Sequence, residues 1–360
     1  MFSSVRAWFD RYFSDPQVVT LALLLIVGSL TLLWVDNFLA PVLVSIVIAY
    51  LLDGLVQQCV RLKVPRFAAV LLVFIGFLIT ALVVLFLLVP LLIQQGQELF
   101  RRLPEMILVG QGLLLELPER YPDFVTEGQV REIIADIRER ASRVGANVVS
   151  FSMGQVVNLI ALVVYMIMVP LLVFFFLKDK RRLVDWFKSY LPENRQLAEG
   201  VWAEVDVQIG NYTRGKLIEM LIVGTVSYVT FSLLGLQFAP LLGVTVGLSV
   251  LVPFIGAAVV TFPVVLVALF QYGLTNEFWY VVAAYGVIQA LDGNVLVPIL
   301  FSEVVDLHPI AIIVAVLFFG GLWGGWGVFF AIPLATLVQA VLKAWPRKPA
   351  TRLHMDSMSL

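Results

Sequence analysis

The chain has 360 residues, of which 61% are hydrophobic and 14% are charged, and its formal net charge at pH 7 is −1. Because ordinary soluble domains are about 25% charged, this composition excludes a soluble domain and predicts a polytopic membrane protein. The near-neutral net charge gives no sign of a nucleic-acid partner. A single cysteine, Cys59, excludes a disulfide within the chain, and two histidines give no metal-ligand pattern, so we expect no metal site and no cofactor.

The first apolar run, Gln17–Val35, is 19 residues long. This exceeds the about 7–15 residues of a signal-peptide core, so we expect it to remain as a transmembrane helix. A helix needs about 20 residues to cross a bilayer. Leu217–Gln271 is long enough for two crossings, separated near Gly235–Pro240, which predicts eight transmembrane helices. They come from seven apolar blocks: Gln17–Val35, Asn37–Leu52, Phe67–Gln95, Met153–Leu177, Leu217–Gln271, Phe278–Phe301 and Pro309–Leu342.

The distribution of Lys and Arg predicts the orientation. With eight crossings, 17 of the 24 fall on one face of the membrane, and the other seven all lie in Gln94–Ser152. The face richer in Lys and Arg is cytoplasmic by the positive-inside rule. We therefore expect both termini and Lys178–Lys216 in the cytoplasm and Gln94–Ser152 outside.

Gln94–Ser152 has the pattern of a small extracytoplasmic helical domain. Thr126-x-x-Gln129 is a capping box. A helical apolar stripe follows it: Val130, Ile133, Ile134, Ile137, Ala141 and Val144. A solvated amphipathic helix that packs on its own neighbours is one interpretation, and a partner-binding or pore-capping surface is the other.

The second polar segment is Lys178–Lys216. We expect a basic stop followed by one or two interfacial helices, with Trp186 and Trp202 as anchors. These features divide the chain into six parts: 1–93 (tail and helices one to three), 94–153 (extracytoplasmic domain), 154–177 (fourth helix), 178–216 (cytoplasmic amphipathic connection), 217–342 (C-terminal transmembrane region) and 343–360 (cytoplasmic tail).

Met220–Asn276 contains no Asp, Glu, Lys, Arg or His over 57 residues. Within it, Pro253 removes a backbone donor and Gly256 lowers helix propensity, so we expect the helix to break there. Free carbonyl groups at membrane depth are tolerated only where they are buried in protein or face a watery cavity. A packed proline kink and a re-entrant or substrate-facing break both fit this pattern.

Asp292 lies in an otherwise apolar helix, with Gln289 and Asn294 nearby and Pro298 following. A carboxylate at membrane depth is costly unless it faces a cavity or a partner, and such residues often mark transport paths. We expect Asp292 to be the protonation or cation-coupling residue, with Gln289 and Asn294 as polar neighbours. A hydrogen-bonded structural network between helices is the alternative.

A glycine-rich segment lies within Pro309–Leu342, which is 34 residues long and therefore long for one crossing. We expect a bend or hairpin around its glycines, with close helix packing as the default role and a gate as the alternative. We also expect this break to approach the one at Pro253 close to Asp292. The glycines form two overlapping small-x-x-x-small pairs: Gly320, Gly321, Gly324 and Gly325.

Asp53 and Glu219 lie near the cytoplasmic ends of predicted helices, beside basic clusters, which favours interfacial salt bridges over transport roles. The chain has no G-x-x-x-x-G-K-[S/T] sequence and no hydrolytic or redox pattern. We therefore expect no catalytic residues and a protein that is not an enzyme.

Five motifs follow one another in the second half: Gly-Leu-x-x-x-Pro (235–240), Leu-Val-Pro-Phe-Ile-Gly (251–256), Gln-x-x-Asp-x-Asn-x-x-x-Pro (289–298), Leu-His-Pro (307–309) and Trp-Gly-Gly-Trp-Gly-Val-Phe-Phe-Ala-Ile-Pro (323–333). Together they resemble the autoinducer-2 exporter family, and within it the PerM-type permeases. The first half matches in layout only. The resemblance implies an eight-helix bacterial inner-membrane permease that forms a homo-oligomer. Members are linked to export of a small furanosyl signal and to sodium–proton exchange, and many carry Glu at the position of Asp292.

The expected function is therefore a secondary transporter or facilitator, in the lipid bilayer, of a small polar solute or ion. Export and coupling to protons or sodium stay open. The alternative is a membrane scaffold in envelope assembly that acts through its extracytoplasmic domain. An ion channel comes third, because no repeated carbonyl filter or charged ring is visible.

Overall fold

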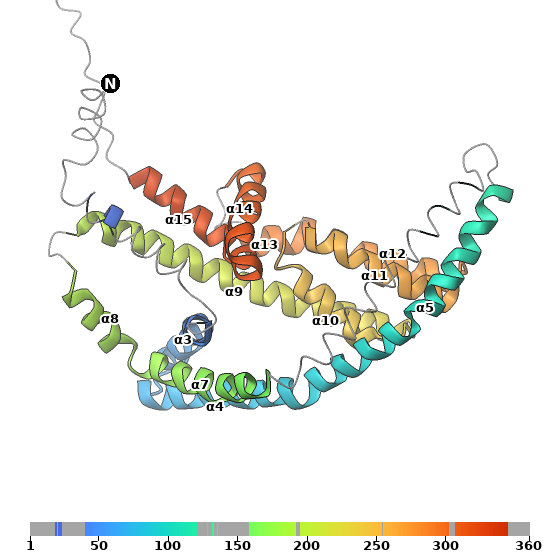
Figure 1. The fold of residues 1–360 in the computed structure, drawn as a ribbon. Coiled ribbons are helices and arrows are strands. Elements are labelled where there is room, and N and C mark those ends of the chain that lie inside the picture. Colours follow the sequence, from blue (N-terminus) through green and yellow to red (C-terminus); the bar gives the residue numbers. More distant parts are fainter. Residues whose placement is uncertain are drawn as a thin grey trace, which may run out of the picture. The chain divides into compact units, whose positions relative to one another are not determined.

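The computed structural model describes residues 19, 21–23, 40–120, 128, 132, 135, 158–191, 195–253, 255–301 and 307–344. Every regular element in these ranges is helical, which confirms the expected all-helical, multi-pass membrane fold (Figure 1). The elements are α3 (Ala40–Arg61), α4 (Arg66–Val83), the π-helical η1 (Val84–Leu88), α5 (Val89–Arg120), α7 (Asn158–Lys178), α8 (Lys180–Ser189), α9 (Gln196–Leu233), α10 (Ala239–Ser249), α11 (Ile255–Tyr272), α12 (Asn276–Leu291), the π-helical η3 (Asp292–Leu296), α13 (Val297–Phe301), α14 (Pro309–Phe329) and α15 (Ala331–Ala344).

Within the described residues, five helical stretches are long and apolar enough to cross a membrane: Pro41–Arg61, Arg66–Gly112, Gln196–Leu233, Ile255–Tyr272 and Asn276–Phe301. Four shorter apolar helices accompany them: Val164–Lys178, Ala239–Ser249, Pro309–Gly325 and Ala331–Ala344. The predicted first helix falls mostly outside the described residues. So do the capping box at Thr126 and all six residues of the stripe that follows it.

The chain forms two compact units. The central unit comprises Pro41–Asp179 and Thr213–Glu303, and the terminal unit comprises Met1–Ala40, Lys180–Tyr212 and Val304–Leu360. Helix α9 contributes its first part to the terminal unit and its second part, from Thr213, to the central unit. The predicted boundary after Lys216 therefore falls inside a continuous helix.

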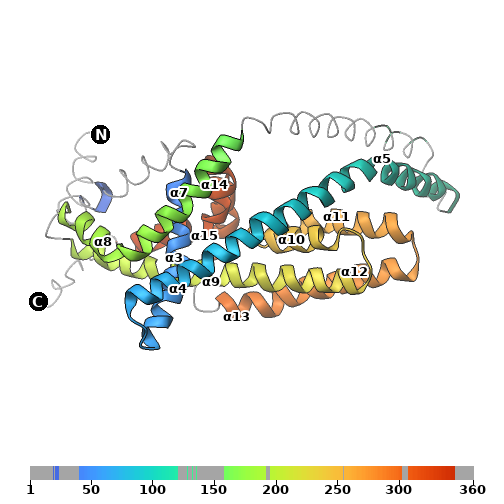
Figure 2. The same ribbon diagram turned by 90° about the horizontal axis from the view of Figure 1, so that it is seen from below.

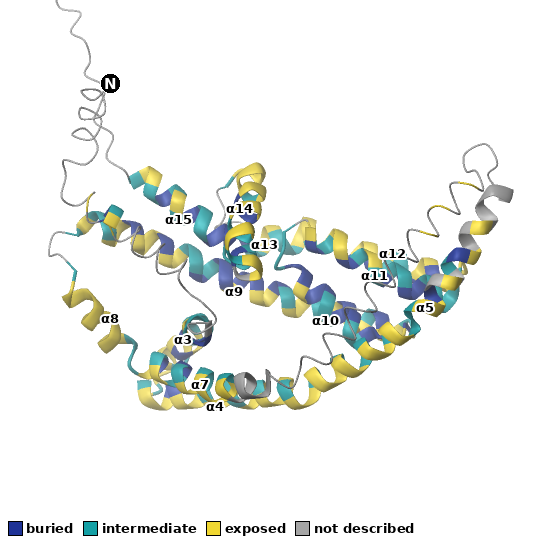
Figure 3. Ribbon diagram, viewed as in Figure 1, coloured by how far each residue is buried: buried dark blue, intermediate teal, exposed yellow. Residues whose placement is uncertain are grey.

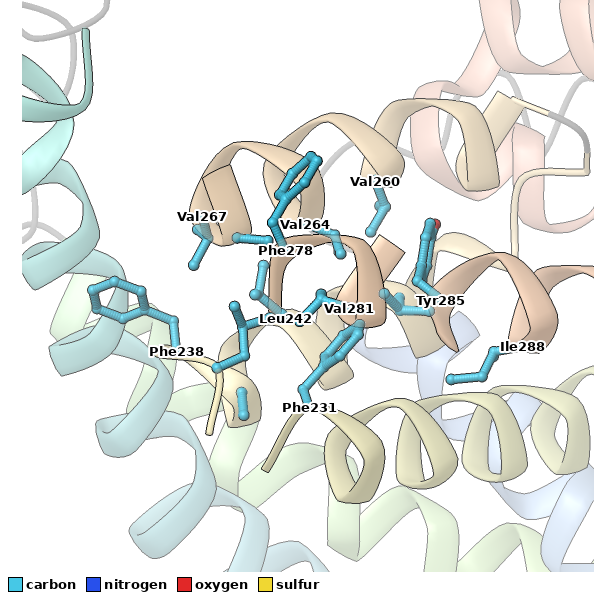
Figure 4. Packing of buried hydrophobic residues seen from close by; sticks show 14 of the residues in the cluster. Phe231, Phe238, Leu242, Val260, Val264, Val267, Phe278, Val281, Tyr285 and Ile288 are labelled. Atoms are coloured by element: carbon cyan, nitrogen blue, oxygen red, sulfur yellow. The ribbon is translucent and has the colours of Figure 1, made fainter. Parts of the chain in front are cut away.

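The larger core of the central unit lies between the second part of α9 and helices α10, α11 and α12 (Figure 4). Val246 and Val264 are fully buried there, and the ring centroids of Phe231 and Tyr285 are 6.2 Å apart. The first half of α5 closes one side of this core with Leu99, Leu103 and Met106. The predicted extracytoplasmic insert thus begins as a helix that is part of the transmembrane core.

A second core of the central unit joins α3, α4 and α7, and α7 runs alongside α4 (Figure 2). Val173 and Ala69 are fully buried in it. Large side chains on the outer surface of α4 and η1 are exposed, as with Phe86 at 63% and Leu87 at 68% (Figure 3). Exposed apolar side chains on a helix this long and apolar are what contact with lipid requires.

Helices α10 and α11 form a hairpin, which decides between the alternatives left open by the sequence. At one end, the backbone of Gly256 lies against the Ser249 carbonyl group. At the other end, Gln271 Oε1 accepts a hydrogen bond from the Gln237 N–H at 2.7 Å. Helix α10 has 11 residues, a rise of about 16 Å, so it cannot cross the bilayer alone. The predicted second crossing of Leu217–Gln271 is therefore a two-helix hairpin.

Glycines bring α9 and α10 into direct backbone contact. A Cβ atom on Gly247 would lie 2.8 Å from the Met220 carbonyl oxygen and 2.9 Å from the Gly224 Cα. Gly243, four residues earlier on α10, packs equally closely on Tyr228. Gly243 and Gly247 have the small-x-x-x-small spacing that permits this approach in membranes. The hairpin is thereby held tightly against α9.

In the terminal unit, α14 reverses direction at Gly324, where φ is 59° and ψ is −135°. Gly327 then lies against the Phe319 carbonyl group, and Ala331 packs on Ala315 and Val316. The predicted hairpin around the glycines is confirmed. In the same unit, α15 packs through Ala340 on Val201 and Val205 of α9.

Candidate functional site

The break between α10 and α11 includes Val250–Pro253. Local hydrogen bonds satisfy much of its backbone: the Val252 N–H donates to the Ser249 carbonyl at 3.0 Å, and the Gly256 N–H donates to the Val252 carbonyl at 2.9 Å. The Val250 carbonyl instead receives a hydrogen bond from Lys216 Nζ, at 2.9 Å. A carbonyl group freed by the break is therefore paired with a charged side chain from another helix, as the low polarity of the membrane requires.

Lys216 lies one turn before Glu219 on α9. Its Nζ atom is 2.8 Å from Glu219 Oε2 and 3.1 Å from Oε1. Both residues are buried, with 6% of Lys216 and 1% of Glu219 exposed. Burying an ion pair is costly unless hydrogen bonds satisfy the remaining donors. The contact with the Val250 carbonyl supplies one such bond, and the salt bridge expected for Glu219 is confirmed.

Asp292 stands where α12 gives way to the π-helical η3. It interacts electrostatically with both Lys216 and Glu219. Its Oδ1 atom is buried and has no hydrogen-bond partner among the described residues. The sequences of α10 and α11 contain no charged residue, so they add no charge to this group. When all three side chains are ionised, the ammonium group is paired with Glu219 and Asp292 adds a second negative charge near it.

Phe301, at the end of α13, covers this group from one side. Its ring centroid is 5.2 Å from Lys216 Nζ, close enough for a cation–π interaction. The ring also rests on Gly215, where a Cβ atom would lie 2.8 Å from the ring edge. The absence of a Cβ atom at Gly215 leaves room for the ring beside the ammonium group. We call Lys216, Glu219, Asp292 and the Val250 carbonyl, with Phe301 over them, the polar cluster.

The two amides predicted to accompany Asp292 bond elsewhere. Gln289 Nε2 donates to the Tyr285 hydroxyl at 2.9 Å, and that hydroxyl lies 3.2 Å from Thr261 Oγ1 on α11. Asn294 Nδ2 donates to the Ala290 carbonyl at 2.8 Å, within its own helix. Gln289 thus belongs to a polar contact between α11 and α12 one turn away from Asp292. Their predicted role beside a bound solute stays a prediction.

The predicted helix-break residues occupy three places. Pro253 and Gly256 form the α10–α11 turn, and Pro298 is an exposed residue at the start of α13, directly after η3. The glycines at 320, 321, 324 and 325 lie in α14, which belongs to the terminal unit. The first break is joined to Asp292 through Lys216, whereas the approach of the α14 break to Asp292 stays a prediction.

Lys216 is the functional candidate that sequence reasoning missed. It was assigned to the cytoplasmic connection because the apolar block begins at the next residue, Leu217. A detectable signal was its spacing: three residues separate it from Glu219, so the two face the same side of a helix. Asp53 accepts a hydrogen bond from Gln57 Nε2 at 2.7 Å, and the salt bridge expected for it stays a prediction.

Comparisons with known proteins place the chain among transport proteins. Residues 21–347 match the model of the AI-2E family transporter. PerM of Escherichia coli strain K12, which is named as a permease, is 46% identical over 349 residues, covering 96% of this chain and 98% of that protein. YrrI of Bacillus subtilis strain 168, which is named as a transport protein, is 24% identical over 309 residues, covering 86% of each.

YueF of the same Bacillus subtilis strain, also named as a transport protein, is 26% identical over 220 residues, covering 61% of this chain and 58% of that protein. The family model and the Escherichia coli relative both extend over nearly the full length of the chain. The helical membrane fold is the one that such a role requires. The chain therefore belongs to the AI-2E transporter family.

Proposed function

We propose that this protein is a secondary transporter of the bacterial inner membrane that moves a small polar solute or ion and is coupled to a cation bound at Asp292. The observation that carries the proposal is the buried, unpartnered Oδ1 atom of Asp292 beside the Lys216–Glu219 pair. A carboxylate oxygen at membrane depth is a costly group that marks ion pathways in transport proteins.

The balance of charge favours a cation as the coupling species. Lys216 is engaged by Glu219, the Val250 carbonyl and the Phe301 ring, so its ammonium group is largely committed within α9 and the break. Asp292 then contributes the second carboxylate of the cluster. A proton or a sodium ion at Asp292 would neutralise it, which lowers the cost of keeping the cluster inside the protein.

The structure also suggests how binding could favour one conformation. The Val250 carbonyl ends α10, Lys216 belongs to α9, and Asp292 begins the π-helical turn of the α12–α13 rod. Three chain segments thus meet at one charged group. A cation that changes the charge there biases the packing of all three, and only a difference in affinity between two states can drive a transport cycle.

The decisive test is gradient-driven flux in proteoliposomes. Asp292→Asn keeps the shape of the side chain and removes its ionisation, so we expect folded protein without proton- or sodium-driven flux. Asp292→Glu keeps the carboxylate and should retain partial flux. The matched control is Glu277→Gln, on the exposed first turn of the same helix, which should behave as wild type.

Normal gradient-dependent flux in the Asp292→Asn protein would show that the carboxylate is structural. The scaffold alternative predicts that outcome, together with loss of function when the extracytoplasmic part is shortened. That shortening has to begin after Arg120, because Leu99, Leu103 and Met106 of α5 belong to the transmembrane core. A deletion of the whole predicted insert would unfold the core and could not separate the two functions.

A further inference from the structure

Helix α8 is an amphipathic helix that is exposed on all sides. Leu183, Trp186, Phe187 and Tyr190 recur at i, i+3, i+4 and i+7, which places them along one stripe. Their exposed fractions are 41%, 58%, 64% and 73%, and every residue of Arg181–Tyr190 is exposed (Figure 3). The aromatic rings contact one another edge to face, with the Trp186 and Tyr190 centroids 5.1 Å apart.

The opposite side of α8 is polar and mainly basic. The helix carries four basic residues and one acidic residue, Asp185. Arg181 and Lys188 lie with Asp185 on the side opposite the aromatic stripe. Arg182 lies next to Trp186 on one flank, and Lys180 lies on the same side as Phe187. An apolar stripe with bulky aromatics and a basic polar face is the pattern of a helix that lies in the membrane interface.

The position of α8 in the chain puts it at a membrane surface. Helix α7 has 21 mostly apolar residues and ends at Lys178, and a single residue, Asp179, separates it from α8. Two residues of extended chain reach about 7 Å at most. Since α7 rises about 31 Å over its length, α8 must begin within that short reach of the bilayer boundary.

We propose that α8 is a docking surface for anionic phospholipid headgroups, with its aromatic stripe inserted among the lipids and its basic side chains bound to their phosphates. Trp and Tyr prefer the membrane interface, and long basic side chains extend from it toward the headgroups. Each basic residue near an anionic surface favours binding by about fivefold, so the cluster gives preference for acidic over zwitterionic lipid.

Two labelling positions on α8 test the orientation. In the full chain with Cys59→Ser, Phe187→Cys and Ser189→Cys place a fluorophore on opposite sides of the helix. In liposomes of phosphatidylglycerol and phosphatidylcholine, spin-labelled lipid should quench the label at position 187, and iodide should quench the label at position 189. Equal iodide quenching at both positions would overturn the proposal. Protection of position 187 from both quenchers would also overturn it, because protein would then cover the stripe.

The charge requirement has its own test. Binding of spin-labelled phosphatidylglycerol relative to phosphatidylcholine should fall by about fivefold for each residue removed in Arg181→Gln/Lys188→Gln. The control is Lys343→Gln, an exposed basic residue in the last turn of α15. An unchanged preference for phosphatidylglycerol in the double variant, with normal folding, would refute recognition of the anionic headgroup.

Discussion

The two helix breaks of the second half accommodate the interrupted helical backbone in different ways. At the α10–α11 break, a carbonyl group left free by the chain is paired with the ammonium group of Lys216. At the α14 break, the chain turns at Gly324. Glycine lets the helical segments on the two sides of the turn pack backbone to backbone, with Gly327 on the Phe319 carbonyl. The first solution brings three ionisable groups together in the protein, whereas the described residues around the second bring none.

This difference separates a candidate functional site from a structural hinge. A turn closed by glycine packing needs no charge and suits a structural hinge. A turn closed by a charged side chain is sensitive to whatever changes that charge. The α10–α11 break has both glycine packing and a charged side chain, because Gly256 also packs on Ser249 at its base. Five substitutions test the comparison.

The largest effect is expected for Lys216→Met. It leaves the Glu219 carboxylate and the Val250 carbonyl buried without their partner, and breaking a buried pair costs about 3–5 kcal/mol of unfolding free energy. Thermal unfolding of the purified protein in detergent measures the loss. Lys216→Met/Glu219→Leu should recover most of the stability but no flux, and the control Lys343→Met should change nothing. A stable single variant would mean that the break does not depend on the ammonium group.

Gly256→Ala and Gly327→Ala should rank next and resemble each other. In both, the new Cβ atom would overlap a backbone carbonyl oxygen, that of Ser249 and that of Phe319 respectively. Such overpacking costs about 3 kcal/mol. Gly286→Ala and Gly325→Ala are the controls, because a Cβ atom there meets nothing within 4 Å. If only Gly256→Ala lowers the melting temperature, the α14 hairpin is looser than its glycine contacts indicate.

Gly324→Ala should cost less, about 2 kcal/mol, because its φ of 59° with ψ of −135° strains any residue that has a Cβ atom. The Cβ atom itself has open space, so the cost is conformational and not steric. We expect a lower melting temperature with retained flux. Abolished flux in a folded Gly324→Ala protein would move the α14 break from the structural class to the functional one.

The smallest effect is expected for Phe301→Leu, which removes the ring above Lys216 and keeps an apolar side chain on Gly215. A cation–π contact of this kind contributes about 1 kcal/mol. The melting temperature should fall slightly, and Phe301→Tyr should restore it. If Phe301→Leu is as damaging as Lys216→Met, the ring does more than accompany the ammonium group.

The sequence predicted both breaks because proline and glycine act through the local backbone. Pro253 cannot donate a hydrogen bond and Gly256 has no Cβ atom, whatever surrounds them. The same holds for Gly324, whereas the membrane depth expected for Asp292 stays a prediction. The all-helical membrane fold followed from the length of the uncharged runs, because a chain inside the bilayer has to satisfy its own backbone hydrogen bonds and a helix does so.

The partners of these residues could not be predicted in the same way. Lys216 contacts a carbonyl group 34 residues further along the chain, and only the folding of α10 against α9 brings the two together. That packing depends on Gly243 and Gly247, and their spacing alone does not tell which helix they contact. Gln289 was placed beside Asp292 from spacing alone, whereas the Tyr285 hydroxyl on the same helix binds its amide.

The π-helical turn at Asp292–Leu296 has a further consequence for the rod that carries it. A π turn amounts to one residue added to an α-helix, and each residue of an α-helix advances the chain by about 100°. The added residue fixes the angle around the helix axis between Ile288, which faces the hydrophobic core, and Phe301, which faces Lys216. Loss of one residue here would leave the rod helical and rotate Phe301 by about a quarter turn away from its place. We therefore expect this turn to tolerate substitutions better than insertions or deletions.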